Sequence, residues 1–471
     1  MNIKIKLANN SLWAILASVF LIVFVLFDIS KNNQNNTDNL FIDAENAYNV
    51  GDYSKSKKLF QIIVANSPND LFANIRIADI LTKAKKYDSA IEYINLIKDV
   101  NTTSDAVILQ KLAENYFYKK NYAKSEELIT ASLNLNRNNL FLIKMMSNIH
   151  LIQGNYQDAL TFLSTFDEDL LNDDLLFNKR IIQIYNKSLE NSSSTNFEDM
   201  TLQNLFIKIE NNLEDYNATD TKIFGATNIC FELLQYNYFE LAKPFSEDII
   251  NYNKYMDHGY FYKALSLLSL GYTSEAQELF KQAYSIKDSN VDNSLMVVLT
   301  NIVLNQSDQI DDSLEKLSKV LLEQDKYKLM EILKYANDNQ KGLLALKIFE
   351  KFPQYLNDDL ISIYFKVKFN AINDNYNNLL GDINRLFAES HYLNDRQKAL
   401  LLGIKGYIIA KETNPIAGKD LILQGLELDN YSTFCYYFLS KVNLLQNDKV
   451  SYDINYAKAK EFDLYQELKY E

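Results

Sequence analysis

The sequence predicts an all-α protein: a solenoid of stacked helix pairs preceded by one transmembrane helix. Glycine (11) and proline (4) are scarce among 471 residues and 47% of the residues are apolar, which favours helices joined by short polar turns. A short motif with a tyrosine recurs about every 34 residues, and such a period indicates stacked repeats. One uninterrupted apolar stretch lies near the N-terminus.

The apolar stretch, residues 11–29, reads SLWAILASVFLIVFVLFDI. Because a membrane-spanning helix needs about 20 mostly apolar residues, we expect a transmembrane signal anchor here. Residues 1–10 carry Lys4 and Lys6 and no acid, whereas acids follow the span, so the positive-inside rule places residues 1–10 in the cytoplasm. The repeats would then be periplasmic or extracellular, and the chain a single-pass protein of the inner (cytoplasmic) membrane.

A cleaved signal peptide and a buried helix of a soluble protein are the alternatives for this stretch. Neither a small-x-small cleavage site nor a lipoprotein cysteine follows Phe27. Ala14 and Ser18 form a small-xxx-small pair, which is compatible with a homo-oligomer. Residues 30–39, SKNNQNNTDN, are expected to be a polar tether.

Residues 40–170 predict four helix pairs. The turn motif begins as Gly51-Asp52-Tyr53, and its tyrosine recurs after 34, 35 and 34 residues. Around each turn, small and apolar residues follow the 3–4 spacing of amphipathic helices, and Pro68 ends the first pair. The residues expected to pack these repeats are small or aromatic: Ala44, Gly51, Tyr53, Ala78, Tyr87, Ala90, Ala113, Tyr122, Gly154, Tyr156 and Ala159.

Residues 171–221 lose the pattern. They are either one degenerate repeat with a long loop at 190–196 or a linker between two arrays. The pattern returns over residues 222–471, with Tyr238 and Thr273 as equivalent positions 35 residues apart and a second helix starting at Asn414-Pro415. The final pair is expected at 436–445 and 453–467. The repeat-packing residues of this block are Ala264, Gly271, Ala276 and Ala283.

The 34-residue period, the small residue midway along each first helix, the Gly-Asp-Tyr turn and Pro68 resemble tetratricopeptide repeats (TPRs) over residues 37–170. The resemblance implies a TPR solenoid, in which antiparallel helix pairs stack into a right-handed α-α superhelix. It also implies a concave groove, lined by the first helices, that binds peptides or protein segments. Two departures are the absence of an early tryptophan and the serines at Ser56 and Ser125, where alanine is usual.

Candidate groove residues lie on the first helices. In the TPR subfamily that clamps a C-terminal carboxylate, Lys and Asn occupy groove positions in neighbouring repeats, which resembles the arrangement of Lys144, Asn148, Asn178 and Lys179. These four residues have three alternative interpretations: a carboxylate clamp, a general polar groove or a merely solvated helix surface. The corresponding positions of earlier repeats would favour a basic or polar segment near the membrane, because they include Glu45, Asp79 and Glu114.

The sequence offers no catalytic or metal-binding motif. His150, His258 and His391 fall in different repeats, and Cys230 and Cys435 lie too far apart in a solenoid for a disulfide. No P-loop, dinucleotide fingerprint or nucleophile elbow is present. A net charge of −13 argues against nucleic acid, because phosphate binding needs a basic surface. We therefore expect no enzyme, cofactor or metal.

These observations predict a membrane-anchored protein–protein interaction scaffold of the cell envelope. It would bind segments of partner proteins in its groove and thereby assemble or coordinate an envelope complex. The alternative is a glycan- or cell-wall-associated binding module whose groove aromatics stack on sugars, an idea motivated by the 32 tyrosines.

Overall fold

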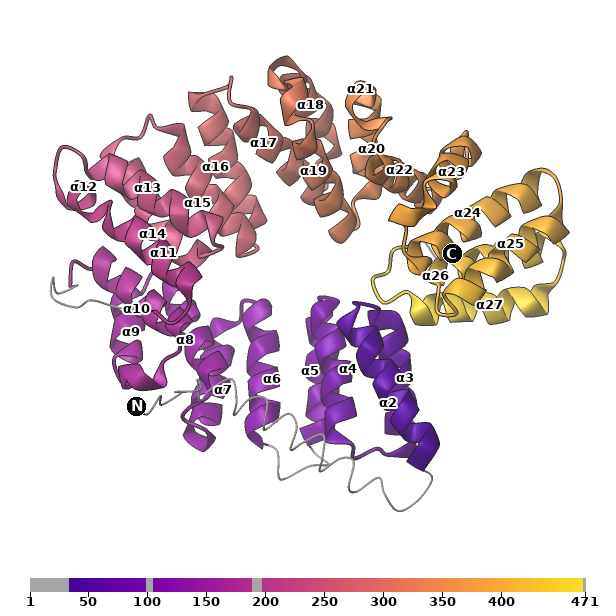
Figure 1. Ribbon diagram of the computed structural model, residues 1–471, viewed down its shortest axis with the longest axis horizontal. Coiled ribbons are helices and arrows are strands. Elements are labelled where there is room, and N and C mark those ends of the chain that lie inside the picture. Colours follow the sequence, from indigo (N-terminus) through magenta and orange to yellow (C-terminus); the bar gives the residue numbers. More distant parts are fainter. Residues whose placement is uncertain (1–33, 99–104, 189–196, 469–471) are drawn as a thin grey trace, which may run out of the picture. The chain divides into compact units, whose positions relative to one another are not determined.

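The computed structural model describes residues 34–98, 105–188 and 197–468 (Figure 1). Within these ranges every regular element is a helix and no strand occurs, so the prediction of an all-α solenoid is confirmed for this part of the chain. The helices belong to two compact units, Met1–Lys119 and Lys120–Glu471, and each unit is considered separately. The expected cytoplasmic residues 1–10 and the membrane span 11–29 lie outside the described residues. Among the described helices, none has the length and apolarity to cross a bilayer.

The first unit contains five described helices, each packed against the next. They are α2 Gln34–Asn49, α3 Tyr53–Asn66, α4 Leu71–Lys83, α5 Tyr87–Lys98 and α6 Asp105–Tyr118. Helix α2 begins six residues before the boundary expected at Leu40, so residues 34–39 of the expected tether are helical. This run contains neither Gly nor Pro, so the helix can extend into it once it has formed, although Asn, Thr and Asp are weak helix formers.

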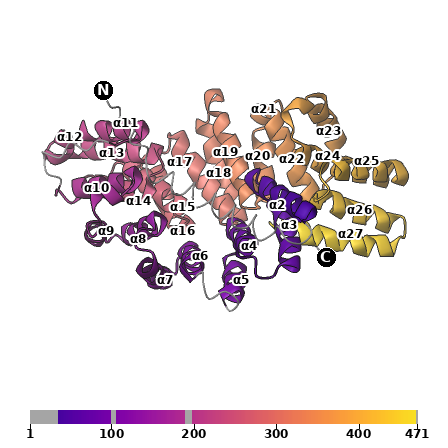
Figure 2. The same cartoon turned by 60° about the horizontal axis from the view of Figure 1, so that its bottom comes forward.

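The second unit continues the series of helices (Figures 1 and 2). Its first eight are α7 Tyr122–Leu135, α8 Leu140–Ile152, α9 Tyr156–Leu163, α10 Asp173–Tyr185, α11 Met200–Glu210, α12 Leu213–Asn217, α13 Lys222–Gln235 and α14 Phe239–Tyr252. The remainder are α15 Asp257–Ser269, α16 Thr273–Ile286, α17 Val291–Val303, α18 Ser307–Val320, α19 Tyr327–Asp338, α20 Gly342–Lys351, α21 Pro353–Leu356, α22 Leu360–Ile372, α23 Leu379–Ala388, α24 Asp395–Glu412, α25 Pro415–Leu428, α26 Thr433–Leu445 and α27 Lys449–Phe462. Short 3₁₀ turns lie at Glu168–Leu170, Glu323–Asp325 and Ser390–Tyr392.

A left-handed backbone residue follows nearly every first helix of a pair. At these positions φ lies between 53° and 81°. At ten of these eleven positions the next residue donates its N–H to a carbonyl five residues back, as Asp52 does to Ala47. This is the Schellman way of ending a helix. Three of the positions are glycines, and the others carry side chains: Gly51, Lys85, Lys120, Gly154, Lys187, Asn237, Gly271, Asn305, Gln340, Asp374 and Asn447.

This backbone position corrects the repeat register expected for the second half. Asn237 and Gly271 are equivalent and 34 residues apart, so Tyr272, not Thr273, corresponds to Tyr238. Residues 291–320 form an ordinary pair around Asn305, although the Gly-Asp-Tyr letters are missing there. Helix α25 starts where the sequence predicts it. The last pair begins earlier than expected, and residues 463–468 are not helical because Asp463 accepts the N–H groups of Glu467 and Leu468.

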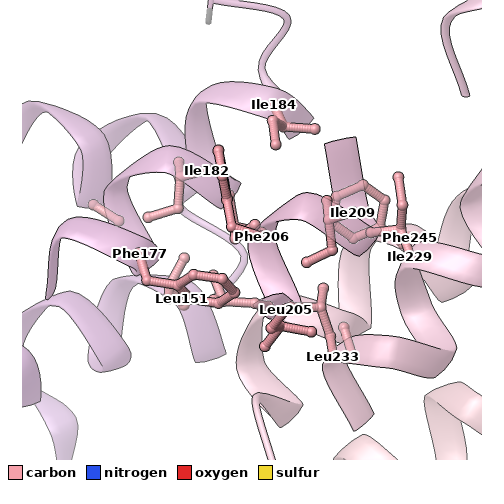
Figure 3. Close-up of a cluster of buried hydrophobic side chains, with 14 of the residues drawn as sticks. Leu151, Phe177, Ile182, Ile184, Leu205, Phe206, Ile209, Ile229, Leu233 and Phe245 are labelled. Carbon is pink, nitrogen blue, oxygen red and sulfur yellow. The ribbon is translucent and has the colours of Figure 1, made fainter. Parts of the chain in front are cut away.

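Residues 171–221 are packed into the array. A single hydrophobic core runs from Ile143 to Ile249 and includes Phe177 of α10 and Leu205 of α11 (Figure 3). The repeat pattern fades because the distance between left-handed turns grows to 50 residues, from Lys187 to Asn237. The extra residues form α11 and α12, which pack against α13.

Small residues sit where paired helices cross. The eight alanines expected to pack the repeats are all fully buried. Ser56 takes the place of alanine because its hydroxyl donates to the carbonyl of Ala44 on the facing helix, at 2.9 Å. Cys230 and Cys435 are free, buried and used in the same way, with Cys435 Sγ 3.1 Å from the carbonyl of Ala399.

Candidate peptide-binding site

A polar pocket of about 290 Å³ lies in the second unit between α8, α10 and the start of α14. Its existence depends on a long-range contact, because α14 packs against α8 and α10, which come about 90 and 60 residues earlier in the chain. The lining residues are Lys144, Asn148, Leu151, Asp174, Asn178, Tyr236, Asn237, Tyr238, Glu240 and Leu241. Three of the four residues that resemble a carboxylate clamp, Lys144, Asn148 and Asn178, therefore line one pocket.

Lys144 and Asp174 form an ion pair on the pocket wall, between Nζ and Oδ2. The other carboxylate oxygen of Asp174 accepts a hydrogen bond from the hydroxyl of Tyr238, at 2.9 Å. The Tyr238 ring also contacts Phe177, with ring centroids 4.7 Å apart. Burial, followed by the charge of Asp174 and this hydrogen bond, raises the pKa of Tyr238, so the phenol stays protonated and remains a donor.

Glu240 occupies the first turn of α14 and accepts a hydrogen bond from Asn148 Nδ2, at 3.2 Å. Within the described part of the chain, no Lys, Arg or His nitrogen lies within ion-pair distance of its carboxylate. Burial is the main cause that raises the pKa of Glu240, with a smaller contribution from the charge of Asp174. A backbone hydrogen bond at Glu240 and the charge of Lys144 oppose it only in part. Glu240 is thus a partly buried carboxylate of the pocket without an ion-pair partner among the described residues.

Asn178 is 2% exposed and lines the same pocket. Its Oδ1 atom is buried and accepts no hydrogen bond from any described residue. An unsatisfied buried amide oxygen costs free energy, so a donor that reaches Asn178 from the pocket would remove that cost.

Lys179 does not reach the pocket. Its ammonium pairs with Glu168 Oε1 at 3.0 Å, and Arg180 pairs with the other oxygen of the same carboxylate. Lys144 is already engaged by Asp174, and Glu240 would repel a bound carboxylate. The four residues thus do not assemble the carboxylate clamp that the sequence left open, because both lysines are ion-paired and α14 packs against α8 and α10.

In the first unit, the acidic groove positions are not isolated. Arg76 on α4 forms a bidentate pair with Glu45 at 2.8 and 3.0 Å and lies 3.6 Å from Asp79. Lys111 on α6 pairs with Asp79 at 2.6 Å and with Glu114 at 3.1 Å. Three acids and two bases thus alternate across neighbouring first helices, and most of the acidic character predicted from the sequence is neutralised.

The tyrosines of the turn motif are half-buried, and their rings contact other aromatic rings. Centroid distances are 5.5 Å for Tyr48–Tyr53, 5.6 Å for Tyr87–Tyr118 and 4.9 Å for Tyr156–Tyr185. These rings are engaged in repeat packing, which leaves less of their surface for stacking on a sugar.

Tyr122 has an additional contact that the sequence did not reveal. Its hydroxyl lies 2.8 Å from the hydroxyl of Tyr272, 150 residues later. Beside it, Lys120 Nζ donates to the carbonyl of Gly271 at 2.8 Å and lies 3.6 Å from the centre of the Tyr272 ring. Two left-handed turns of distant repeats are thereby joined within the second unit.

Sequence reasoning missed Asp174, Tyr238 and Glu240 at the pocket and Arg76 and Lys111 in the first unit. For the two bases a signal existed, because Arg76 and Lys111 are 35 residues apart and each lies three residues before a groove acid. For the pocket residues no local signal existed, since their partners lie 64 and 92 residues away. In the described residues, no three His, Cys, Asp or Glu side chains gather into a metal site.

No protein-family model and no curated protein matches this chain. Among solved structures, yeast Tom70 is similar with 16% identity over 84% of this chain and 92% of that chain, at a TM-score of 0.30. The Cut9–Hcn1 hetero-tetramer of the APC/C gives 12% identity, coverages of 91% and 94% and a TM-score of 0.33. YrrB, described as a TPR protein with an unusual peptide-binding site, is 12% identical over 46% of this chain and 92% of that chain, at a TM-score of 0.26. At these identities and scores, we transfer neither activity nor partner from them.

Proposed function

We propose that this chain is a scaffold that binds segments of other proteins and is held at a membrane by residues 11–29. The observation that carries the binding role is the pocket between α8, α10 and α14, in which Glu240 is not ion-paired and Asn178 Oδ1 accepts no hydrogen bond within the described chain. A stacked array of helix pairs supports such a role, since it presents a long surface from many short repeats.

The membrane part of the proposal rests on the sequence. Residues 11–29 are apolar over a length that suits a spanning helix, and the basic residues lie on the N-terminal side. In this arrangement the N-terminus is cytoplasmic and the solenoid lies on the other side of the membrane, which is the periplasm in a Gram-negative cell. A partner would then belong to an assembly of the cell envelope.

Photo-crosslinking in cells tests the binding role. A benzophenone amino acid replaces Tyr236, which lines the pocket, or Tyr255, which is 73% exposed and does not line it. We expect a discrete protein adduct from the Tyr236 position and none of the same mass from the Tyr255 position. The absence of any protein adduct at Tyr236, or identical adducts at both positions, would argue against the pocket as a binding surface.

The membrane role requires a separate experiment. Alkaline phosphatase fused after residue 471 should be active if the solenoid is outside the cytoplasm, whereas a fluorescent protein that folds only in the cytoplasm should be dark. Deletion of residues 1–29 should move the chain from the membrane fraction to the soluble fraction. A bright cytoplasmic reporter would overturn the orientation, and membrane retention of the deleted chain would overturn the anchor.

A further inference from the structure

We propose that the pocket between α8, α10 and α14 takes the ammonium of a lysine or the guanidinium of an arginine in the partner segment. This inference deepens the proposed function and rests on it, because it names the chemistry that the bound segment must carry. It also departs from a carboxylate clamp, which would require the opposite charge.

The charges that line the pocket favour a cation. Its ionisable lining groups are Lys144, Asp174 and Glu240, apart from the phenols. Lys144 and Asp174 neutralise each other, and Glu240 is held by the uncharged amide of Asn148. A bound cation would place an opposite charge beside a carboxylate that the fold has desolvated, whereas a bound anion would face two carboxylates.

Asn178 is an independent observation that points to a hydrogen-bond donor as ligand. Its buried Oδ1 has no donor among the described residues, and it lines the pocket together with Glu240. An ammonium carries three N–H donors and a guanidinium five, and neither carries an acceptor. An ammonium or a guanidinium therefore brings donors for Glu240 and for the side chain of Asn178, and it adds the positive charge that a neutral side chain lacks.

The raised pKa of Glu240 gives the inferred binding a pH dependence. Burial raises the pKa of Glu240, and Lys144 on α8 and Asp174 on α10 are the charged groups that act on it from the facing helices. The charge of Glu240 also contributes to the raised pKa of Tyr122 on α7. A bound cation favours the ionised carboxylate, so binding should release a proton and should become tighter as the pH rises from about 4.5 toward neutrality.

Four peptide pools test the inference directly. Capped random hexapeptides share one fixed central residue, which is lysine, Nε-acetyl-lysine, glutamate or alanine in the respective pool. The full-length chain, in a nonionic detergent because residues 11–29 are apolar, is passed over each immobilised pool. We expect the lysine pool to retain about three- to tenfold more protein than the acetyl-lysine pool, which corresponds to about 0.7–1.4 kcal/mol, the contribution of one ordinary hydrogen bond.

Glu240→Gln is the decisive variant, because it keeps an acceptor for Asn148 and removes the negative charge. It should bring retention by the lysine pool down to that by the acetyl-lysine pool. Glu278→Gln is the matched control, since it changes the net charge equally at a side chain that is 69% exposed on α16. This control removes the objection that a chain with a net charge of −13 attracts any basic peptide.

A second measurement needs no partner segment. In Tyr236→Cys, the introduced thiol lines the pocket, while the native Cys230 and Cys435 are fully buried. The variant equilibrates with an equal mixture of cystamine and bis(2-hydroxyethyl) disulfide, and intact-mass spectrometry measures the two mixed disulfides. We expect about a threefold excess of the aminoethyl adduct at pH 7, falling to parity when Glu240→Gln is added.

The outcomes separate this inference from the proposed function. Equal retention by the lysine and acetyl-lysine pools, or equal amounts of the two disulfide adducts, would overturn the preference for a cation and leave peptide binding intact. A lysine preference that survives Glu240→Gln would also overturn it, because the cation would then bind elsewhere. Retention by none of the four pools would instead count against peptide binding itself.

Discussion

Asn148 and Glu240 are joined by a hydrogen bond of 3.2 Å, from Nδ2 to Oε1, although 92 residues separate them in the chain. The bond shows that a helix of a later repeat, α14, packs into the surface formed by the earlier first helices α8 and α10. Together with these helices, α14 encloses the small polar pocket that Glu240 lines.

Glu240→Gln should not destabilise the fold at pH 7. The folded-state pKa of Glu240 is raised above 4.5 by burial, so the folded chain holds this proton more tightly than the unfolded chain does. Stability is then lost as the pH rises from about 4.5 through the folded-state pKa, and the glutamine variant avoids that loss. Urea unfolding should give a midpoint at or above that of the unsubstituted chain at pH 7 and an equal midpoint at pH 4. A clearly lower midpoint at pH 7 would contradict the assignment.

Tyr238→Phe should cost about 1–2 kcal/mol, because it removes a hydrogen bond to a carboxylate and keeps the ring. The lost bond is the 2.9 Å contact from the Tyr238 hydroxyl to Asp174 Oδ1, and the ring contact with Phe177 stays. Hydrogen exchange of the α10 and α14 amides measures the local loss. Tyr255→Phe is the control, since Tyr255 is 73% exposed and should change stability by less than about 0.5 kcal/mol.

A double-mutant cycle with Asp174→Asn would show whether Tyr238 acts through this carboxylate. The two substitutions should be non-additive by about 1 kcal/mol, because each removes the same bond. Additive effects would mean that the Tyr238 hydroxyl contributes by another route.

Two glycines should respond differently to alanine. Gly154 has φ +81° and open space where the methyl group of an alanine would lie. Gly154→Ala should therefore lose only the free energy of holding an alanine in the left-handed conformation, about 1 kcal/mol. At Gly418, a Cβ would lie 2.3 Å from the Gly406 carbonyl oxygen on the facing helix α24. Gly418→Ala should therefore cost more than about 2 kcal/mol through separation of α24 and α25. Thermal unfolding compares the two variants, and equal losses would refute the close crossing.

Arg76→Lys should loosen the first unit even though it keeps the charge. Arg76 makes two parallel bonds to Glu45 and lies over the rings of Tyr48 and Phe72, at 4.6 and 4.8 Å from their centroids. A lysine keeps neither the bidentate geometry nor the planar stacking, so we expect a loss of about 1 kcal/mol. Hydrogen exchange of the α2 and α4 amides provides the measurement.

Lys124→Arg is the comparison for that substitution. Lys124 pairs with Glu127 at 2.6 Å, but both side chains are largely exposed. Because exposed ion pairs contribute little, the change should stay below about 0.5 kcal/mol. Similar effects of the two substitutions would mean that the ion pairs of the first unit are no more than surface contacts.

The helix pairs could be predicted from the sequence because their signals are local. A left-handed residue follows nearly every first helix, and small residues such as Ala44 and Ser56 recur at the helix crossings. The prediction lost the register after residue 171, since the marker is a backbone conformation that Lys187 or Asn305 can adopt as well as glycine. The residue types of the motif therefore predict the repeat register less well than the left-handed backbone conformation does.

The candidate site was predictable only in part. Lys144, Asn148 and Asn178 follow from their places on first helices, and all three line the pocket. Lys179 lies one residue further along α10, and its side chain reaches Glu168 instead. A helix places adjacent residues about 100° apart, so only one of the neighbours Asn178 and Lys179 could point toward α14.

By itself, the sequence determined the helices, their repeat period and an apolar stretch near the N-terminus, because each depends on residues close together in the chain. Only the tertiary structure decided that Glu240 meets Asn148, that Tyr238 meets Asp174 and that Tyr122 meets Tyr272. These contacts join helices that are 64 to 150 residues apart in the chain, and a local sequence pattern carries no information on which distant helices meet. The charge of the pocket, and with it the kind of partner we propose, is a consequence of those long-range contacts.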